Sequence, residues 1–397
     1  MIILFNKKMK SRTKIQEYLR NVSHVLLTIA LSPIFYLGVF FNKIKSREER
    51  LKILVIQRGK IGDLVCTTGI FRLIKEKYPD SYLAVLATTY TSDIIANNPY
   101  IDEIIKFDEG RSGIGYFVDI VKKIKREKFR FSISLQFGGI NSILPFWSMI
   151  PCRISTSSPH APTSSKILSI FNSHNIEYKD KDMTFKHCAK ILKFLDIDVP
   201  MVGIDLFTDE ASERKAGNFL KEKGLSENDF LVGICPTVGA NKLKEWGPEK
   251  WIALSNLLID NLAAKIILVG APGDSDVISK IQKGTMMRAI DSSGVFSLGE
   301  IAAFLKKMKI CITSFSAPMH IADGVGTPIV AIAGPSNFYN QPPIGEKTKI
   351  VYHSLDCYPC DFFAKAPRFC KEGHYRCIKE TTADEVYRAI VDLMKKK

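Results

Sequence analysis

The stretch LKILVIQRGKIGDLVCTTGIFRLIKEKYP, residues Leu51–Pro79, decides the fold class of this chain. It contains Ile53–Ile56, an apolar run too short for a helix and ended by polar residues and Gly59, which predicts a buried strand. Apolar residues then recur at helical spacing after Gly62, so we expect a helix to begin near Asp63. A buried strand that leads into an amphipathic helix is typical of α/β proteins with parallel sheets.

Asp63 has two interpretations in this setting, and neither excludes the other. As a helix N-cap, its carboxylate would accept hydrogen bonds from backbone N–H groups that have no partner within the helix. As a general base, it would lie at the mouth of a ligand crevice, because open α/β sheets bind ligands beyond the carboxyl ends of their strands. The loop is therefore the first candidate for catalysis.

The length and composition indicate a folded protein with more than one domain. Of its 397 residues, 46% are hydrophobic and 24% are charged, which suits about two or three domains. The formal net charge is +15, and residues 1–52, with 11 basic and 3 acidic side chains, contribute +8 of it. No stretch interleaves basic and aromatic residues as a nucleic-acid surface does, so nucleic acid is not an expected partner.

The basic N-terminal region brackets an apolar stretch, His24–Phe41, that contains no Asp, Glu, Lys or Arg. Its length is close to the lower limit for a membrane-spanning helix, about 17 to 25 residues. Basic residues on both sides favour anionic headgroups but neither orientation. Pro33 would allow a bent segment that lies on the membrane surface with both ends on one side. The alternatives are a single span and a buried core helix; a cleaved signal peptide is not expected.

Strand and helix patterns alternate along the rest of the chain, which predicts two parallel sheets with right-handed crossovers. The stretch Asp196–Asp209, with Pro200 and several acids, is the candidate linker. We therefore expect an α/β fold with a membrane-associated segment at 1–50 and Rossmann-like domains at 51–205 and 206–397 that face one ligand cleft. The predicted strands are Ile53–Ile56, Tyr82–Ala87, Glu103–Phe107, Phe131–Gln136, Phe230–Pro236, Lys265–Val269, Lys309–Thr313 and Pro328–Ala333. The predicted later helices are Phe117–Ile124, Pro248–Asp260, Leu298–Met308 and Pro318–Val325.

Three loops of the second half carry candidate ligand-binding residues. Thr237 and Lys244 follow a predicted strand and precede a predicted helix, an arrangement suited to an anion, although a loop lysine is more often simply solvated. Asp274 ends the loop GAPGD and is either a ribose ligand or a helix cap. Ser316 precedes a predicted helix as its N-cap, and His320 either reaches the cleft or is structural.

Short motifs of the two halves form an ordered series. They are Gly62-Asp63, Lys244-Glu245-Trp246-Gly247-Pro248, Gly270–Asp274, Pro318-Met319-His320, Gly326-Thr327-Pro328 and Gly334-Pro335. In this order they resemble glycosyltransferase family 9, the bacterial heptosyltransferases of lipopolysaccharide core assembly. The resemblance covers the chain from about Leu51 to the C-terminus and leaves out the first fifty residues.

The resemblance implies a GT-B fold, with the acceptor held mainly by the first Rossmann-like domain and a nucleotide-sugar by the second. It also implies an inverting reaction that generally needs no metal. Asp63 matches the family's catalytic base, which removes the proton from an acceptor hydroxyl as that oxygen attacks the anomeric carbon. Lys244 matches the lysine that neutralises the leaving diphosphate, whose charge grows in the transition state. Lys60 and Gly62 would form the acceptor-side loop.

For the donor, the resemblance implies that Thr237 helps to hold phosphate and that Asp274 occupies the acidic ribose position. Ser316 and His320 would border the donor. ADP-heptose or a similar nucleotide-sugar is the expected donor, and a lipopolysaccharide-core or other lipid-linked glycan is the expected acceptor. The enzyme would act in the cytoplasm, on the cytoplasmic face of the inner membrane, without a cofactor for catalysis.

One position departs from the family pattern. The family usually has an acidic residue before the Pro-Met-His motif, at the position of Phe315 in this chain. A buried apolar ring there would remove a hydrogen-bond acceptor worth about 1 to 3 kcal/mol, so the sugar is less defined than the nucleotide. The alternative function is a nucleotide-sugar-binding homologue with lost or altered catalysis. A redox enzyme is disfavoured because no Gly-x-Gly-x-x-Gly follows a predicted strand.

Four of the nine cysteines cluster in the segment 357–377. Their spacing is Cys357-x2-Cys360-x9-Cys370-x6-Cys377, and His374 lies between the last two. A structural zinc ion or an iron–sulfur cluster is one interpretation. Free thiols or two disulfides are the other, because the gaps do not match a standard zinc pattern. In either case the segment is interpreted as structural.

Overall fold

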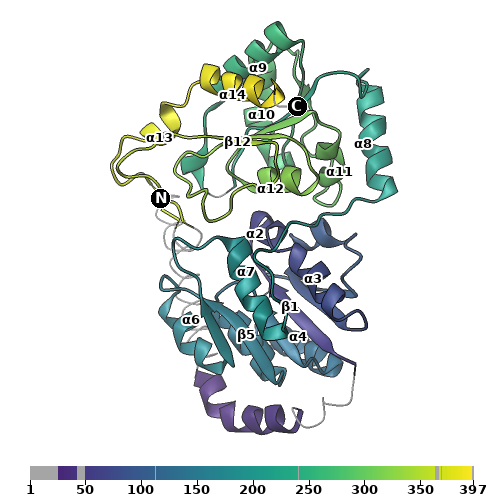
Figure 1. The fold of residues 1–397 in the computed structure, drawn as a ribbon, viewed down its shortest axis with the longest axis vertical. Coiled ribbons are helices and arrows are strands. Elements are labelled where there is room, and N and C mark those ends of the chain that lie inside the picture. The colour runs from purple at the N-terminus through teal and green to yellow at the C-terminus, as the bar shows by residue number, and fades with distance from the viewer. Residues whose placement is uncertain are drawn as a thin grey trace, which may run out of the picture.

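The chain forms two halves, each built around a six-stranded parallel sheet (Figure 1). The computed structural model describes residues 26–42, 50–111, 113–239, 241–362, 366–367 and 369–395. The strands of the first half are β1 (Lys52–Gln57), β2 (Tyr82–Thr88), β3 (Glu103–Phe107), β4 (Phe131–Ser134), β5 (Cys152–Ser157) and β6 (His174–Glu177). The strands of the second half are β7 (Leu231–Cys235), β8 (Lys265–Leu268), β9 (Ile290–Asp291), β10 (Ile310–Ser314), β11 (Ile329–Ile332) and β12 (Thr348–Val351).

The two sheets have the same topology. Their strand orders are β3-β2-β1-β4-β5-β6 and β12-β11-β10-β7-β8-β9. In each half the first strand lies inside the sheet, the next two strands extend to one side and the last three extend to the other. This is the doubly wound order whose central switch point binds ligands in Rossmann-type folds. The predicted α/β class with two parallel sheets is confirmed.

Helices cover both sheets (Figure 1). Those of the first half are α2 (Ile61–Val65), α3 (Gly69–Lys77), α4 (Ile114–Glu127), α5 (Gly139–Trp147), α6 (Thr163–Leu168) and α7 (Thr184–Leu192). Those of the second half are α8 (Glu210–Glu222), α9 (Pro248–Leu262), α10 (Ser275–Gly284), α11 (Ile301–Lys306), α12 (Ala317–Gly324), α13 (Arg376–Lys379) and α14 (Ala383–Lys395).

The eight predicted strands are all present, with ends shifted by a few residues. Strands β5, β6, β9 and β12 were not predicted because they are short or polar, as in the sequence HNIE of β6.

Strand β1 is buried on both faces, as its continuous apolar run predicts. Val55 pairs in parallel with Val85 of β2 and with Ile133 of β4. Leu54 and Ile56 belong to one hydrophobic cluster, while Val55 belongs to another on the opposite face. A strand in this position has its carboxyl end at the centre of the sheet edge, which is where the loop with Asp63 begins.

The single helix predicted after Gly62 is in fact two helices, α2 and α3. Thr67 and Thr68 separate them, and their hydroxyls donate to the carbonyls of Leu64 and Val65, each at 2.8 Å. Such side-chain bonds compete with helix continuation. The N-cap of α2 is Lys60 and Asp63 is the third helical residue, so the prediction of Asp63 as the N-cap itself was wrong.

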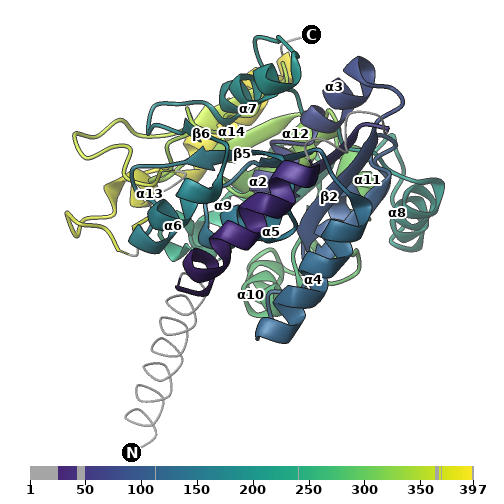
Figure 2. The ribbon, with the colours of Figure 1, turned by 90° about the horizontal axis from the view of Figure 1, so that it is seen from below.

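The described part of the apolar N-terminal stretch is a helix at residues 26–42, which lies along the first half (Figure 2). The Phe35 ring packs on Phe146 and Trp147 of α5, with centroids 5.5 and 5.3 Å apart. The indole N–H of Trp147 donates to Oγ1 of Thr28 at 3.1 Å. Within the described ranges, no helix is both long and apolar enough to cross a bilayer.

The two halves are joined by a segment, residues 196–209, without helix or strand. Asp205 of this segment pairs with Arg72 of α3 at 2.9 Å, and its backbone N–H donates to Oγ1 of Thr68. The halves also touch directly through α2 and α12, where Sγ of Cys66 lies 3.2 Å from Nδ1 of His320. The domain boundary at residue 205 stays a prediction. The joining segment itself is bound to the first half through Asp205.

Candidate active site

A cavity of about 980 Å³ lies between the halves, where β1 and β10 end. This is within the size range of small-molecule sites, and its place is the one that doubly wound sheets favour. The sequence-predicted residues that line it are Lys60, Gly62, Asp63, Lys244, Ser316 and His320. The fold thus brings together loops more than 250 positions apart in the chain.

Asp63 is held by donors from both halves. Its Oδ2 accepts from the backbone N–H of Lys60 and from the side-chain amide of Gln136, both at 3.1 Å. Its Oδ1 accepts from the amide of Gln341, in the second half, at 3.2 Å. The carboxylate is therefore fixed in orientation at the cavity wall, while its remaining lone pairs are available to a ligand hydroxyl.

The electrostatic environment suits Asp63 to proton transfer. Burial raises the pKa of its carboxyl, whereas hydrogen bonds from Gln341, Lys60 and Gln136 act to lower the pKa. A carboxylate with a raised pKa is a stronger base, as long as it remains ionised at working pH. The donors around Asp63 favour the ionised form and so oppose its neutralisation by burial.

Lys244 projects into the same cavity from a short turn, residues 242–244. Its Nζ lies 2.7 Å from Oδ2 of Asp361 and donates to the carbonyl of Phe315 at 3.4 Å. The Phe315 ring centroid is 6.0 Å from the same nitrogen. A partly buried ammonium group beside an open cavity is suited to pair with a phosphate group, because it is weakly screened there.

His320 lines the cavity from α12 but is almost fully buried. Burial, together with the nearby charge of Lys244, lowers its pKa to about 3, so the imidazole is neutral at physiological pH. Gly62 approaches it closely, since a Cβ on that glycine would lie 3.1 Å from Cδ2 of His320. His320 therefore reaches the cleft and is also structural, because it forms part of the contact between the halves.

Ser316 occupies the N-cap position of α12, as predicted, and lines the cavity. Its hydroxyl donates to the Ser314 carbonyl at 3.2 Å and does not cap the helix. Thr237 and Asp274, by contrast, are not among the described lining residues. Asp274 occupies the N-cap position of α10, but its side chain does not cap that helix and instead accepts from the backbone N–H of Ala271 at 2.8 Å.

Several lining residues were not predicted from the sequence. Arg58 directly follows β1, pairs with Glu109 at 3.0 Å and lies over the Phe107 ring; a cation right after a central strand was a signal that could have found it. Other unpredicted lining residues are Gln136, Ser336, Asn337, Asn340, Gln341 and Asp361. None of these six residues belongs to the motifs of the series, so only the fold identifies them.

The sequence of the chain also matches a known protein family. Residues 117–366 match the family model described as "Glycosyltransferase family 9 (heptosyltransferase)". The chain belongs to glycosyltransferase family 9. The predicted resemblance is thereby confirmed, and the chain is a glycosyltransferase.

Named relatives of this family 9 chain match nearly its whole length. It is 22% identical to lipooligosaccharide heptosyltransferase 2 of Haemophilus ducreyi, over 87% of this chain and 99% of that protein. A solved family 9 glycosyltransferase from Veillonella parvula has a TM-score of 0.76 and 23% identity, over 88% of this chain and 99% of that one. The ADP-heptose heptosyltransferase II of Escherichia coli has a TM-score of 0.69 and 18% identity, over 87% and 98%. The two-domain fold is therefore the fold of these enzymes.

The cysteine-rich segment of this family 9 glycosyltransferase lies beside the cavity. All four clustered cysteines and His374 line one small pocket, with Sγ of Cys357 3.8 Å from Nε2 of His374. All four thiols are free. Across the described ranges, no three His, Cys, Asp or Glu side chains are arranged to hold a metal ion. The segment remains interpreted as structural.

Proposed function

We propose that this glycosyltransferase moves a sugar, with heptose on ADP as the favoured donor, to a hydroxyl of a lipopolysaccharide-core or other lipid-linked glycan. The observation that carries the proposal is the placement of Asp63 and Lys244 on one cavity, each from a different half. A base and a cation on facing loops suit an acceptor and a leaving group bound between them. The named relatives are heptosyltransferases, which supports the choice of sugar.

In the proposed reaction, Asp63 accepts the proton of the acceptor hydroxyl as its oxygen attacks the anomeric carbon. The bond between that carbon and the diphosphate oxygen breaks, and the diphosphate leaves with the electron pair. Lys244 stabilises the growing negative charge on the leaving group, an interaction stronger in the transition state than in the ground state. Lys60 and Gly62 would lie on the acceptor side, and Ser316 and His320 beside the donor.

The decisive variant is Asp63→Asn. Loss of a general base costs about 100- to 10,000-fold in turnover, while the thermal stabilisation by ADP-heptose should remain, because the base does not hold the donor. Asp80→Asn, an exposed acid after α3, is the matched control and should transfer as the wild type does. Undiminished turnover of Asp63→Asn would refute the proposal. A wild-type protein that binds ADP-heptose but transfers to no acceptor would instead support the binding-only alternative, which the Phe315 position motivates.

We further propose that the enzyme works on a membrane surface, held by the helix at 26–42. One face of this helix packs on α5 through Phe35, and the other face is exposed. No residue from 26 to 42 is charged. Its exposed large apolar side chains are Leu26, Leu27, Ile29, Ile34, Tyr36, Leu37, Phe40 and Phe41. Such a face is suited to the boundary between headgroups and acyl chains, where Phe and Tyr rings are favoured.

The positive charge of the residues after this helix also supports contact with a membrane. Lys43, Lys45, Arg47 and Arg50 directly follow the helix in sequence, and clusters of basic residues attract anionic lipids. Because Phe35 and Thr28 bind the helix to the first half, its proposed orientation is parallel to the membrane and not across it. The acceptor domain would then remain next to its lipid-linked substrate.

Flotation with phospholipid vesicles tests this surface. The wild type should float with vesicles that contain phosphatidylglycerol, and the double variant Leu37→Glu/Phe41→Glu should remain unbound, since both side chains belong to the exposed apolar face. The control Val295→Glu/Met394→Glu changes two exposed apolar residues of the second half and should float normally. A double variant that floats as well as the wild type would exclude the helix as the membrane contact. A different result would show that a second copy of the chain covers this face: the wild type does not float, it forms dimers without lipid, and the double variant is a monomer.

A further inference from the structure

Asp361 is the carboxylate that pairs with Lys244 in the cavity. The separation is 2.7 Å, and the Asp361 side chain is only 6% exposed while that of Lys244 is 20% exposed. The amide of Asn241 also donates to Oδ2 of Asp361 at 3.3 Å. The same Asn241 accepts, through its side-chain oxygen, from the backbone N–H of Leu243. Asn241 thus joins the turn that carries Lys244 to the carboxylate that pairs with it.

The position of Asp361 is set by its backbone. Its N–H donates to the carbonyl of Pro335 at 3.1 Å, and its carbonyl accepts from the N–H of Asn337 at 2.8 Å. The preceding residue, Cys360, also donates to Pro335. The side chain of Asp361 is therefore brought to the cavity by main-chain bonds that a substitution at this position leaves intact.

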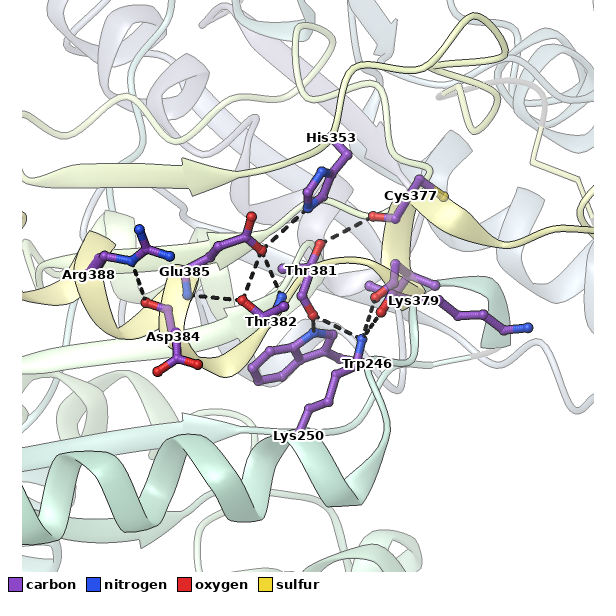
Figure 3. A network of polar contacts seen from close by, with 11 residues as sticks. Trp246, Lys250, His353, Cys377, Lys379, Thr381, Thr382, Asp384, Glu385 and Arg388 are labelled. Carbon is purple, nitrogen blue, oxygen red and sulfur yellow. Dashed lines mark hydrogen bonds and ion pairs between the residues drawn. The ribbon is translucent and has the colours of Figure 1, made fainter.

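The chain on the other side of Lys244 is also tied to the C-terminal segment (Figure 3). The indole N–H of Trp246 donates to the carbonyl of Thr381 at 2.8 Å. Lys250, in the first turn of α9, donates to the same carbonyl at 2.9 Å and to that of Ile378 at 3.0 Å. The chain that follows Lys244 is thereby held by residues 378–381, while Lys244 itself is held by Asp361.

We propose that Asp361 is a positioning residue that holds the ammonium group of Lys244 where the charge of the leaving diphosphate develops. This inference rests on the proposed function of Lys244. A lysine has a long, flexible side chain, and fixing it before the reaction removes an entropic cost from the chemical step. The other close contacts of its Nζ, the carbonyl and the ring of Phe315, carry no full charge. Asp361 is therefore the charged group that fixes the position of the Lys244 ammonium, which a fully solvated lysine would not have.

Asp361→Asn tests the inference, because the amide keeps the size and removes the charge. We expect kcat to fall about 10- to 100-fold, with the KM for the nucleotide-sugar donor changed less than about threefold. Asp356→Asn is the matched control: it makes the same change on an exposed residue of the same segment, outside the cavity. A larger KM with an unchanged kcat would overturn the positioning role, since it would indicate a contribution to binding alone.

A double-mutant cycle with Lys244→Met separates positioning from a purely structural role. If Asp361 acts through Lys244, Asp361→Asn should have no further effect once Lys244 is Met. An equal loss in both backgrounds would show a structural role and overturn the inference. The inference would also be overturned if Lys244→Met lowered kcat while Asp361→Asn kept the wild-type kcat. That result would leave the proposed function intact. Full activity of Lys244→Met itself would refute the role of Lys244 in the proposed function, and the inference with it.

Discussion

Gln341 of the second half donates its side-chain amide to Oδ1 of Asp63 in the first half, with 3.2 Å between the two atoms. Gln136, which also donates to the carboxylate of Asp63, belongs to the same half as Asp63. The Gln341 bond therefore exists only while the two halves are close together. It is one of the hydrogen bonds that act to lower the pKa of Asp63.

Removal of this bond should change the pH dependence of transfer. Gln341 favours the ionised form of Asp63, so Gln341→Leu should raise the pKa of Asp63 further. Because the base must be ionised, the acid limb of the kcat profile should move to higher pH while the plateau changes little. Gln136→Leu, which removes a donor from the same half, should act in the same direction. An unmoved acid limb in both variants would argue against Asp63 as the titrating base.

The docking of the N-terminal helix can be measured with a matched pair of phenylalanines. Phe35 packs on two rings of α5, whereas Phe41 is 64% exposed. Phe35→Ala should weaken docking by about 2 kcal/mol and accelerate amide hydrogen exchange in residues 26–42 by about 30-fold. Phe41→Ala should leave exchange in lipid-free protein within error. Equal exchange in the two variants would show that Phe35 does not hold the helix.

A buried histidine outside the site should make stability depend on pH. Burial lowers the pKa of His187 from 6.5 to about 4, and Thr156 lies 3.0 Å from its Nε2. Between these values the unfolded chain binds more protons than the folded chain, so stability present above pH 6.5 is lost as pH falls toward 4, by up to about 3 kcal/mol. His187→Gln should flatten this part of the profile in urea unfolding. His174→Gln, on an exposed side chain of β6, is the control, and an identical slope in wild type and His187→Gln would contradict the prediction.

The cysteine-rich segment should contain thiols and not metal. Burial raises the pKa of Cys377 to about 11 and also raises the pKa of Cys360, so both thiols are expected to be protonated, weak nucleophiles at neutral pH. Protein purified with a reductant and without a chelator should contain much less than one zinc or iron per chain by elemental analysis. After denaturation it should release all nine cysteines to a thiol reagent. A stoichiometric metal, or four protected cysteines, would contradict this prediction.

The elements predicted best are those whose pattern is local. Strand β1 was predicted because an apolar run between polar residues can only be buried, and its loop was found because Asp63 directly follows it. Helix boundaries were less accurate, since the hydroxyls of Thr67 and Thr68 divide what apolar spacing alone predicts as one helix. Edge strands such as β6 were missed because their residues are exposed and polar.

The sequence by itself determined the α/β class, the two halves and the loops that bear Asp63 and Lys244. These features follow from local patterns, since a buried strand appears as a short apolar run and a helix as apolar residues at helical spacing. Only the tertiary structure decided which distant groups act on those side chains. Gln341 is 278 positions from Asp63, and Asp361 follows Lys244 by more than a hundred, at positions without a motif. Such contacts depend on how two sheets are packed and not on local pattern, so the environment of the base and of the cation became visible only in the fold.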